Sequence, residues 1–201
     1  MASIYQLKPR FQALLRPTVQ RLYDRGVTAN QVTVAAAVVS ILLGLLLAGL
    51  PHVTSLFILV PVWMLLRMAL NAVDGMLARE FGQQSTLGAY LNELSDVVAD
   101  AALYLPFALL AGVSPALVVL VVLSATFSEY AGVMGPLAGA SRRYDGPMGK
   151  SDRAFAFGVV GTGVAFGLLD GMWVNGLMLV ILALSLYTLY NRVRHGLAET
   201  R

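Results

Sequence analysis

The chain alternates long apolar runs with short polar interruptions. Six runs approach the length of about 20 residues that a helix needs to cross a hydrocarbon core about 30 Å thick. The interruptions contain Pro, Gly and charged residues, which end helices and form loops. The pattern predicts an all-α integral membrane protein with six transmembrane helices, at roughly 32–50, 54–78, 87–111, 115–136, 153–170 and 173–192.

Residues 3–24 have a different pattern, in which apolar residues recur at helical spacing among basic ones. This is typical of an amphipathic helix lying in the membrane interface, although an ordinary solvated helix shows the same pattern. Arg and Asp interrupt the segment throughout, which argues against a secretory signal peptide. We therefore expect a cytoplasmic amphipathic helix at 1–28, a six-helix membrane domain at 29–195 and a cytoplasmic tail at 196–201.

The basic residues set the predicted orientation. All but one of the 14 Lys and Arg residues precede the first run, follow the last run, or lie in or beside alternate loops. Short loops rich in Lys and Arg stay in the cytoplasm, so both termini are predicted to be cytoplasmic. The exception is Arg67, inside the second run. The net charge of +3 reflects this basic rim, and anionic membrane lipid explains it better than nucleic acid does.

The chain contains no Cys, which excludes disulfides, thiolate metal sites and Cys nucleophiles. Its two His residues, His52 and His195, fall in a loop and in the tail, so neither is well placed as a general base inside a span. Chemistry within the spans therefore depends on carboxylate, amide and guanidinium groups.

Carboxylates lie inside two of the predicted spans. Asn71 and Asp74 share a face of the second span, and Asn92, Asp96 and Asp100 share a face of the third. A short loop joins the two spans, so the two faces can meet at the cytoplasmic end of an antiparallel pair. An ionisable group in a bilayer is costly unless it is paired, hydrated or bound to a cation. Oxygen ligands from two facing helices suit Mg²⁺ or Mn²⁺.

Small residues accompany these carboxylates. Gly75 and Ala78 leave the helix surface bare, so a substrate could approach the backbone closely, and Arg79 offers a planar fork for a phosphate. The alternative interpretation is structural. In that case the carboxylates pair with Arg67 or are hydrated, and the small residues, Gly88 among them, serve close helix packing.

At these residues the chain resembles the CDP-alcohol phosphotransferases, also called CDP-alcohol phosphatidyltransferases. Their pattern is D-x-x-D-G-x-x-A-R, eight residues, then G-x-x-x-D-x-x-x-D, and this chain aligns with it without gaps. Asn71 and Asn92 stand where the family usually has Asp. The resemblance covers the whole chain, includes a family-like entry to the first span at 28–33, and is strongest to a bacterial branch. The matching residues are Asp74, Gly75, Ala78, Arg79, Gly88 and Asp96.

The resemblance implies transfer of a phosphatidyl group from CDP-diacylglycerol to the hydroxyl of a small polar alcohol, which could itself be phosphorylated, with release of CMP in phospholipid biosynthesis. It also implies one or two ions of Mg²⁺ or Mn²⁺, a homodimer, and a cytoplasmic active site in a bacterial inner membrane, with Asp96 as the catalytic base. The implied metal ligands are Asp74, Asp96, Asn71 and Asn92, with Asp100 as a further candidate. The implied CDP-binding residues are Asp74, Gly75, Ala78, Arg79 and Gly88, with Asn30 and Thr33 as further candidates.

The fourth loop carries basic residues on the same predicted side as the acidic cluster. In family members that use phosphorylated alcohols, basic residues here contact the acceptor phosphate. The acceptor residues that we expect are Lys150, Arg153, Arg142, Arg143 and Glu129. The alternatives are a topology signal or a lipid-headgroup contact for the basic residues, and an ion pair with Arg67 for Glu129.

The sequence leaves four rival functions open: transfer from a different CDP-activated donor, hydrolysis with water replacing the alcohol, a silent CDP-lipid-binding relative, and a small transporter of divalent cations or solutes. Transporters bind near the bilayer midplane between repeats, whereas the charges here gather at one end and no repeat is evident. Replacing two carboxylates by Asn71 and Asn92 removes two negative charges, which predicts altered metal occupancy.

Overall fold

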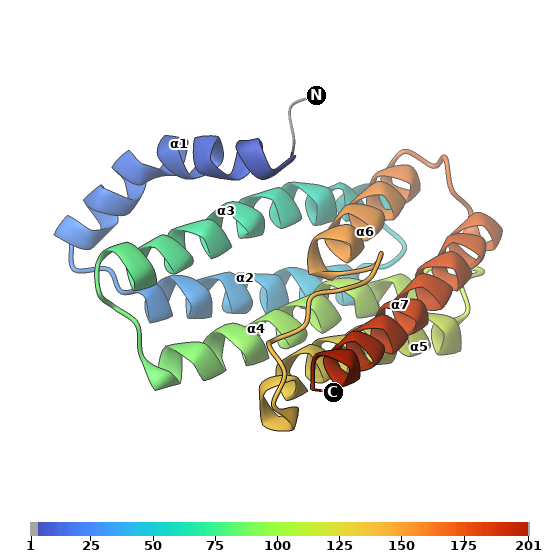
Figure 1. Cartoon of the computed structure of the whole chain (residues 1–201). Helices are drawn as coiled ribbons and strands as arrows, with labels where there is room; N and C mark the ends of the chain where they lie inside the picture. The colour runs from blue at the N-terminus through green and yellow to red at the C-terminus, as the bar shows by residue number, and fades with distance from the viewer. Residues whose placement is uncertain (1–3, 201) are drawn as a thin grey trace. The chain divides into compact units, whose positions relative to one another are not determined.

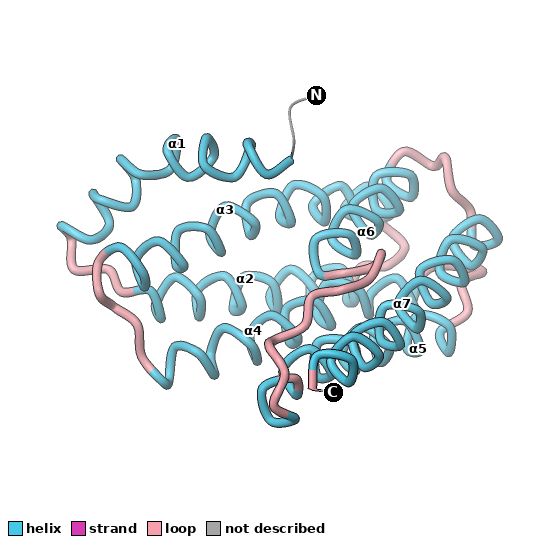
Figure 2. Tube along the Cα trace, viewed as in Figure 1, coloured by secondary structure: helices cyan, strands magenta, loops and turns pink. Residues whose placement is uncertain are grey.

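A computed structural model describes residues 4–200, with side chains from Phe11 onward. These residues form seven α-helices and three short 3-10 helices, and no strand occurs among them (Figures 1 and 2). The all-α prediction is confirmed. The α-helices are α1 (Ile4–Asp24), α2 (Ala29–Gly49), α3 (Leu59–Glu80), α4 (Thr86–Tyr104), α5 (Pro115–Met134), α6 (Lys150–Ala165) and α7 (Gly171–Glu199). The 3-10 helices are η1 (Thr54–Ile58), η2 (Leu105–Leu109) and η3 (Pro136–Ala138).

Four helical segments within residues 4–200 are long and apolar enough to cross a membrane, which is typical of a membrane protein. They are α2, the continuous η1–α3 segment Thr54–Glu80, α5 and α7. Two further predicted spans coincide with shorter or more polar helices. α4 has three acidic residues among its 19, and α6 has 16 residues, which is about 24 Å of helix. The count of six spans therefore stays a prediction.

The chain divides into two compact units. Unit 1 is Met1–Ser40 with Leu65–Ala99, and unit 2 is Ile41–Met64 with Asp100–Arg201. The division falls inside α2, α3 and α4, so these helices contribute one part to each unit. The three-part division expected from sequence, at 28 and 195, stays a prediction.

In unit 1, α1 packs its apolar face on α2 and α3. Val19 of α1 is fully buried beside Val32 of α2 and Met76 of α3. A salt bridge of 3.0 Å joins Arg16 of α1 to Glu80 at the end of α3. Leu14, in contrast, is 74% exposed. The amphipathic pattern of α1 thus serves packing on one side and leaves an apolar residue exposed on another, and its place in the membrane interface stays a prediction.

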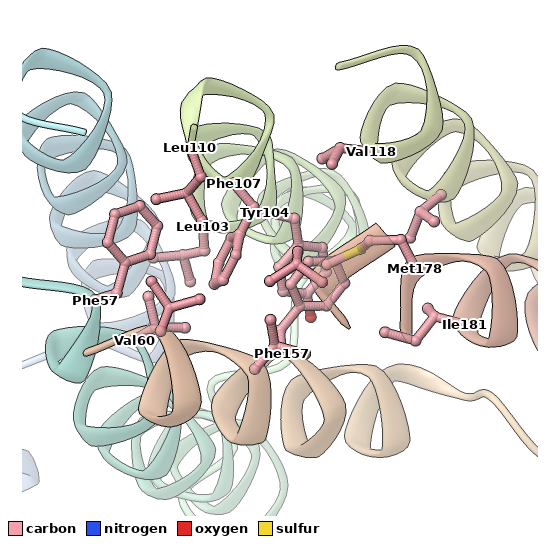
Figure 3. Close-up of a cluster of buried hydrophobic side chains, with 14 of the residues drawn as sticks. Phe57, Val60, Leu103, Tyr104, Phe107, Leu110, Val118, Phe157, Met178 and Ile181 are labelled. Atoms are coloured by element: carbon pink, nitrogen blue, oxygen red, sulfur yellow. The ribbon is translucent and has the colours of Figure 1, made fainter. Parts of the chain in front are cut away.

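In unit 2, aromatic rings fill the centre of the core (Figure 3). Tyr104 and Phe157 stack with ring centroids 3.8 Å apart, and Phe107 meets Phe157 edge-on at 5.3 Å. α2 and α4 come so close that a Cβ on Gly44 would collide with the carbonyl oxygen of Ala102. This core joins parts of α2 to α7.

Candidate functional site

Asp74 lies on the face of α3 that packs against α2, and only 6% of the residue is exposed. Thr33 of α2 donates a hydrogen bond from its hydroxyl to Asp74 Oδ2 over 2.7 Å. The same hydroxyl lies 3.1 Å from the Ala29 carbonyl, but its single hydrogen is better used by the closer, charged acceptor. The hydrogen bond fixes the orientation of a buried carboxylate.

Asp96 of α4 is held by an arginine from α3. Arg67 donates from Nη2 to Asp96 Oδ1 over 3.0 Å and to the Asp96 backbone oxygen over 3.2 Å. Arg67 is 5% exposed, so this ion pair is largely removed from solvent. The structural alternative that pairs a motif carboxylate with Arg67 is therefore realised for Asp96. The same contact also fixes the position of the carboxylate that the motif assigns as the base.

The remaining oxygen ligands of the motif are amides. Asn71 is half-buried on α3 and Asn92 is exposed on α4, each one turn before the corresponding Asp. No group of three or more His, Cys, Asp or Glu side chains placed to hold a metal occurs within the described part of the chain. Only Asp74 and Asp96 of the four motif positions carry carboxylates. Two carboxylate and two amide groups nevertheless fit a hard divalent cation whose coordination is completed by substrate phosphate oxygens.

Two motif glycines lie against polar side chains in unit 1. A Cβ on Gly75 would come within 2.7 Å of Arg79 Nη2, so the Arg79 guanidinium folds back over Gly75. A Cβ on Gly88 would come within 2.8 Å of Asn30 Oδ1, which places α2 and α4 side by side at this point. Ala78 packs on the apolar core of the unit. The structure therefore brings the CDP-binding candidates of α3 together, and brings Asn30 to Gly88.

A second group of charged residues is buried in unit 2. Glu129 of α5 accepts a hydrogen bond from Arg153 of α6, with Oε1 2.7 Å from Nη2. Its other oxygen, Oε2, lies 3.2 Å from Nη1 of Arg192 on α7. Asp100 completes the group, with Oδ2 3.6 Å from Arg153. Arg153 and Arg192 are only 1% and 2% exposed. We name the group the buried ion network; its members are Asp100, Glu129, Arg153 and Arg192.

The two arginines of this network also hold the loop at 139–149. Arg153 Nη1 donates to the Met148 carbonyl over 3.0 Å, and Arg192 Nε donates to the Asp145 carbonyl over 3.4 Å. The Met148 amide donates to the Thr188 hydroxyl over 2.9 Å. The network therefore fastens the loop to α6 and α7.

Sequence reasoning assigned Arg192 only to the basic rim and missed its place in this network. A signal was present along α7, where Ser185, Thr188 and Arg192 follow one another at spacings of three and four within an apolar helix. All three residues are buried. A polar stripe of this kind on an apolar helix indicates contact with other polar groups.

The other predicted acceptor residues, Arg142, Arg143 and Lys150, lie in the loop at 139–149 or directly after it. Arg143 forms salt bridges with Asp145, at 2.8 Å, and with Glu199, at 2.5 Å. Arg142 lies over the ring of Tyr144 at 4.9 Å, and Lys150 is the first residue of α6. The hydrogen bond from the Arg143 guanidinium holds the pKa of Asp145 below its ordinary value of 3.8. Among these predicted acceptor residues, the buried ion network contains Arg153 and Glu129.

Comparison with known proteins identifies the class. The CDP-alcohol phosphatidyltransferase family model matches residues 26–187, and the chain belongs to this family. It is 47% identical over 192 residues to the inner membrane protein YnbA of Escherichia coli, covering 96% of this chain and 95% of that protein. It is also 29% identical over 163 residues, 78% of each chain, to the archaetidylinositol phosphate synthase of Aeropyrum pernix.

Solved structures share the fold. The phosphatidylinositol phosphate synthase PgsA1 of Mycobacterium tuberculosis, in complex with manganese and citrate, superposes with a TM-score of 0.73 at 18% identity, covering 90% of this chain and 88% of that one. The same enzyme with CDP-DAG bound gives a TM-score of 0.69 over 92% of each chain. The family resemblance drawn from the sequence motif is thus confirmed.

Proposed function

We propose that this protein transfers a phosphatidyl group from CDP-diacylglycerol to the hydroxyl of a small polar alcohol and releases CMP. The observation that carries the proposal is the arrangement of Asp74 and Asp96 in unit 1. Each of these motif carboxylates is held by a side chain from another helix, Thr33 for one and Arg67 for the other. Membership of the CDP-alcohol phosphatidyltransferase family supports it.

In the proposed reaction the acceptor hydroxyl oxygen bonds to the phosphorus of the phosphatidyl group, and the bond from that phosphorus to the CMP oxygen breaks. Asp96 accepts the hydroxyl proton, and Arg67 fixes the direction in which that carboxylate faces. Arg79 binds the phosphates of the CDP group through its planar fork. A bound Mg²⁺ or Mn²⁺ would neutralise charge on the phosphoryl oxygens, held by Asp74, Asp96 and the two amides.

The proposed site holds one divalent cation where the family motif provides ligands for two. Asn71 and Asn92 remove two negative charges, and Arg67 adds a positive charge 3.0 Å from Asp96. Asp74, Asp96 and Arg67 together carry a formal charge of −1, which suits one cation bound together with an anionic substrate. Arg67 thus supplies part of the positive charge that a second cation would bring.

We also propose the orientation and assembly of the molecule. Its E. coli relative is an inner membrane protein, and the basic residues favour cytoplasmic termini and a cytoplasmic active site. Six spans and a homodimer complete the proposal, and CDP-diacylglycerol would enter sideways from the bilayer.

The decisive experiment measures CMP release by the purified protein in lipid nanodiscs with CDP-diacylglycerol and Mn²⁺ or Mg²⁺. Acceptors would include glycerol, inositol, serine and the phosphates of glycerol and inositol, and Asp96→Asn is the matched control. Release that needs an acceptor and is lost in the variant supports phosphatidyl transfer. Release without any acceptor would indicate a hydrolase, and metal-dependent CDP-lipid binding without release would indicate a silent relative; both results contradict the proposal.

A further inference from the structure

We propose that the acceptor is an uncharged alcohol, a polyol without a phosphate group, and that Glu129 is the residue that determines this specificity. The inference rests on the proposed function, since it assigns the buried ion network to the acceptor. Its basis is the position of Glu129 between the two buried arginines of unit 2.

The Glu129 carboxylate takes the position that an acceptor phosphate would need. Its two oxygens are divided between Arg153, at 2.7 Å, and Arg192, at 3.2 Å. A phosphate bridging two guanidinium groups uses its oxygens in the same way. Because a side chain of the protein already supplies these oxygens, the two arginines are engaged before any acceptor arrives.

The charge of the network leads to the same result. Two arginines and two carboxylates, Glu129 and Asp100, sum to zero, and the four side chains are between 1% and 15% exposed. Adding a phosphate would place its negative charges beside two carboxylates where water does not screen them. Juxtaposed like charges of this kind cost several kcal/mol, which corresponds to a discrimination of at least about 100-fold.

The positive charge of Arg143, in the loop at 139–149, is also balanced within the protein. Arg143 lies between Asp145 and Glu199, at 2.8 and 2.5 Å. This arginine therefore serves to fasten the loop to α7, and its charge is balanced by carboxylates of the protein itself.

The network retains a polar group that suits a hydroxyl. The Nε–H of Arg153 is buried and has no hydrogen-bond partner among the described residues. A buried donor of this kind is destabilising unless it is satisfied, and the hydroxyl oxygen of a neutral ligand would satisfy it. The nearby Ser128 hydroxyl is already engaged, since it accepts from Arg153 Nη1 over 3.4 Å and donates to the Ala125 carbonyl over 2.8 Å. A polyol hydroxyl would satisfy the Arg153 Nε–H without adding charge to the network.

The test compares matched acceptor pairs, glycerol with glycerol 3-phosphate and inositol with inositol phosphate. For the wild-type protein, kcat/KM from CMP release should favour the uncharged member at least about 100-fold. Glu129→Gln keeps the shape of the side chain and leaves the network with a charge of +1, so it should shift the ratio at least about tenfold toward the phosphorylated member. Glu129→Asp, which keeps the charge, should remain close to the wild type.

A double variant shows whether an altered acceptor preference comes from the charge of the network or from a damaged fold. Glu129→Gln combined with Arg192→Gln returns the network to a charge of zero, and the preference for the uncharged acceptor should return with it. Ligand-induced thermal shifts with the same acceptor pairs report on the site even in protein that releases no CMP. A wild-type preference for phosphorylated acceptors, or a ratio unchanged by Glu129→Gln, would overturn the inference while leaving phosphatidyl transfer intact. Absence of CMP release with every acceptor would contradict the proposed function instead.

Discussion

Thr33 donates its hydroxyl hydrogen to Asp74, the carboxylate that we propose as a metal ligand. Their 2.7 Å hydrogen bond joins α2 to α3 and orients a buried carboxylate. Thr33→Val removes the hydroxyl and keeps the branched shape of the side chain. We expect Mn²⁺ affinity or the rate of CMP release to fall about 10- to 100-fold, because partners of metal ligands contribute effects of this size. Thr33→Ser should retain most of the function, and a Thr33→Val protein equal to the wild type would refute this role.

Asn71 and Asn92 allow the number of bound cations to be tested directly. Electron paramagnetic resonance titration with Mn²⁺ and CDP-diacylglycerol should give one tightly bound ion per wild-type chain. Replacing both residues by Asp restores two negative charges and should add a second ion. Two tightly bound ions in the wild type would show that amide oxygens suffice and that Arg67 does not substitute for a cation.

At the scale of helices, the close approach of α2 and α4 depends on a residue without a side chain. A Cβ on Gly44 would collide with the backbone of Ala102, and backbone cannot move aside cheaply. Gly44→Ala should destabilise the protein by about 1–3 kcal/mol, as overpacking does. Gly176→Ala in α7 is the matched control, because no described atom lies within 4 Å of its Cβ, and its higher helix propensity should be neutral or stabilising by up to about 1 kcal/mol. Thermal unfolding in the same detergent measures both, and equal effects would contradict the packing argument.

Two salt bridges of Arg143, with Asp145 and with Glu199, fasten the loop at 139–149 to α7. We name these two salt bridges the clasp, and we expect it to weaken in acid. Arg143 lowers the pKa of Asp145 below its ordinary value of 3.8, so the clasp stabilises the fold fully above that value and weakens as the pH falls through the lowered pKa. Hydrogen exchange of the loop, corrected for intrinsic rates, should therefore show constant protection from pH 6 to about pH 4 and lose protection between about pH 4 and pH 3. Asp145→Asn should show reduced protection already at pH 6. Constant protection of the wild-type loop down to pH 3 would refute the clasp.

The sequence predicted most helices because an apolar run of fixed length reports directly on a helix. The predicted ends of the helices were less accurate. In the predicted span at 87–111, the α-helix ends at Tyr104 and the chain continues as η2, because Pro106 has no amide hydrogen to donate to an α-helical bond. The motif carboxylates were found because their spacing repeats along one helix. The hydrogen-bond partners of Thr33 and Arg192 could not be predicted from the sequence, because these contacts join residues 41 or more positions apart.

At the scale of the whole molecule, the absence of Cys makes the number of spans measurable. Ser114→Cys and Ser151→Cys are nearly isosteric and introduce single thiols before α5 and at the start of α6. With six spans, a membrane-impermeant thiol reagent applied to intact cells should label Ser114→Cys and spare Ser151→Cys. If only α2, α3, α5 and α7 cross the membrane, the labelling reverses, so one experiment decides between the two topologies.

The buried ion network also constrains how the chain enters its membrane. α6 is about 24 Å long, shorter than a hydrocarbon core, and it carries the charged residue Arg153 in its first turn. α6 is therefore a poor insertion segment by itself. Glu129 on α5 leaves the ribosome first, and pairing with it removes the isolated charge of Arg153. We expect α5 and α6 to leave the translocon as a pair, and Arg192 of α7 to join the pair through its contact with Glu129.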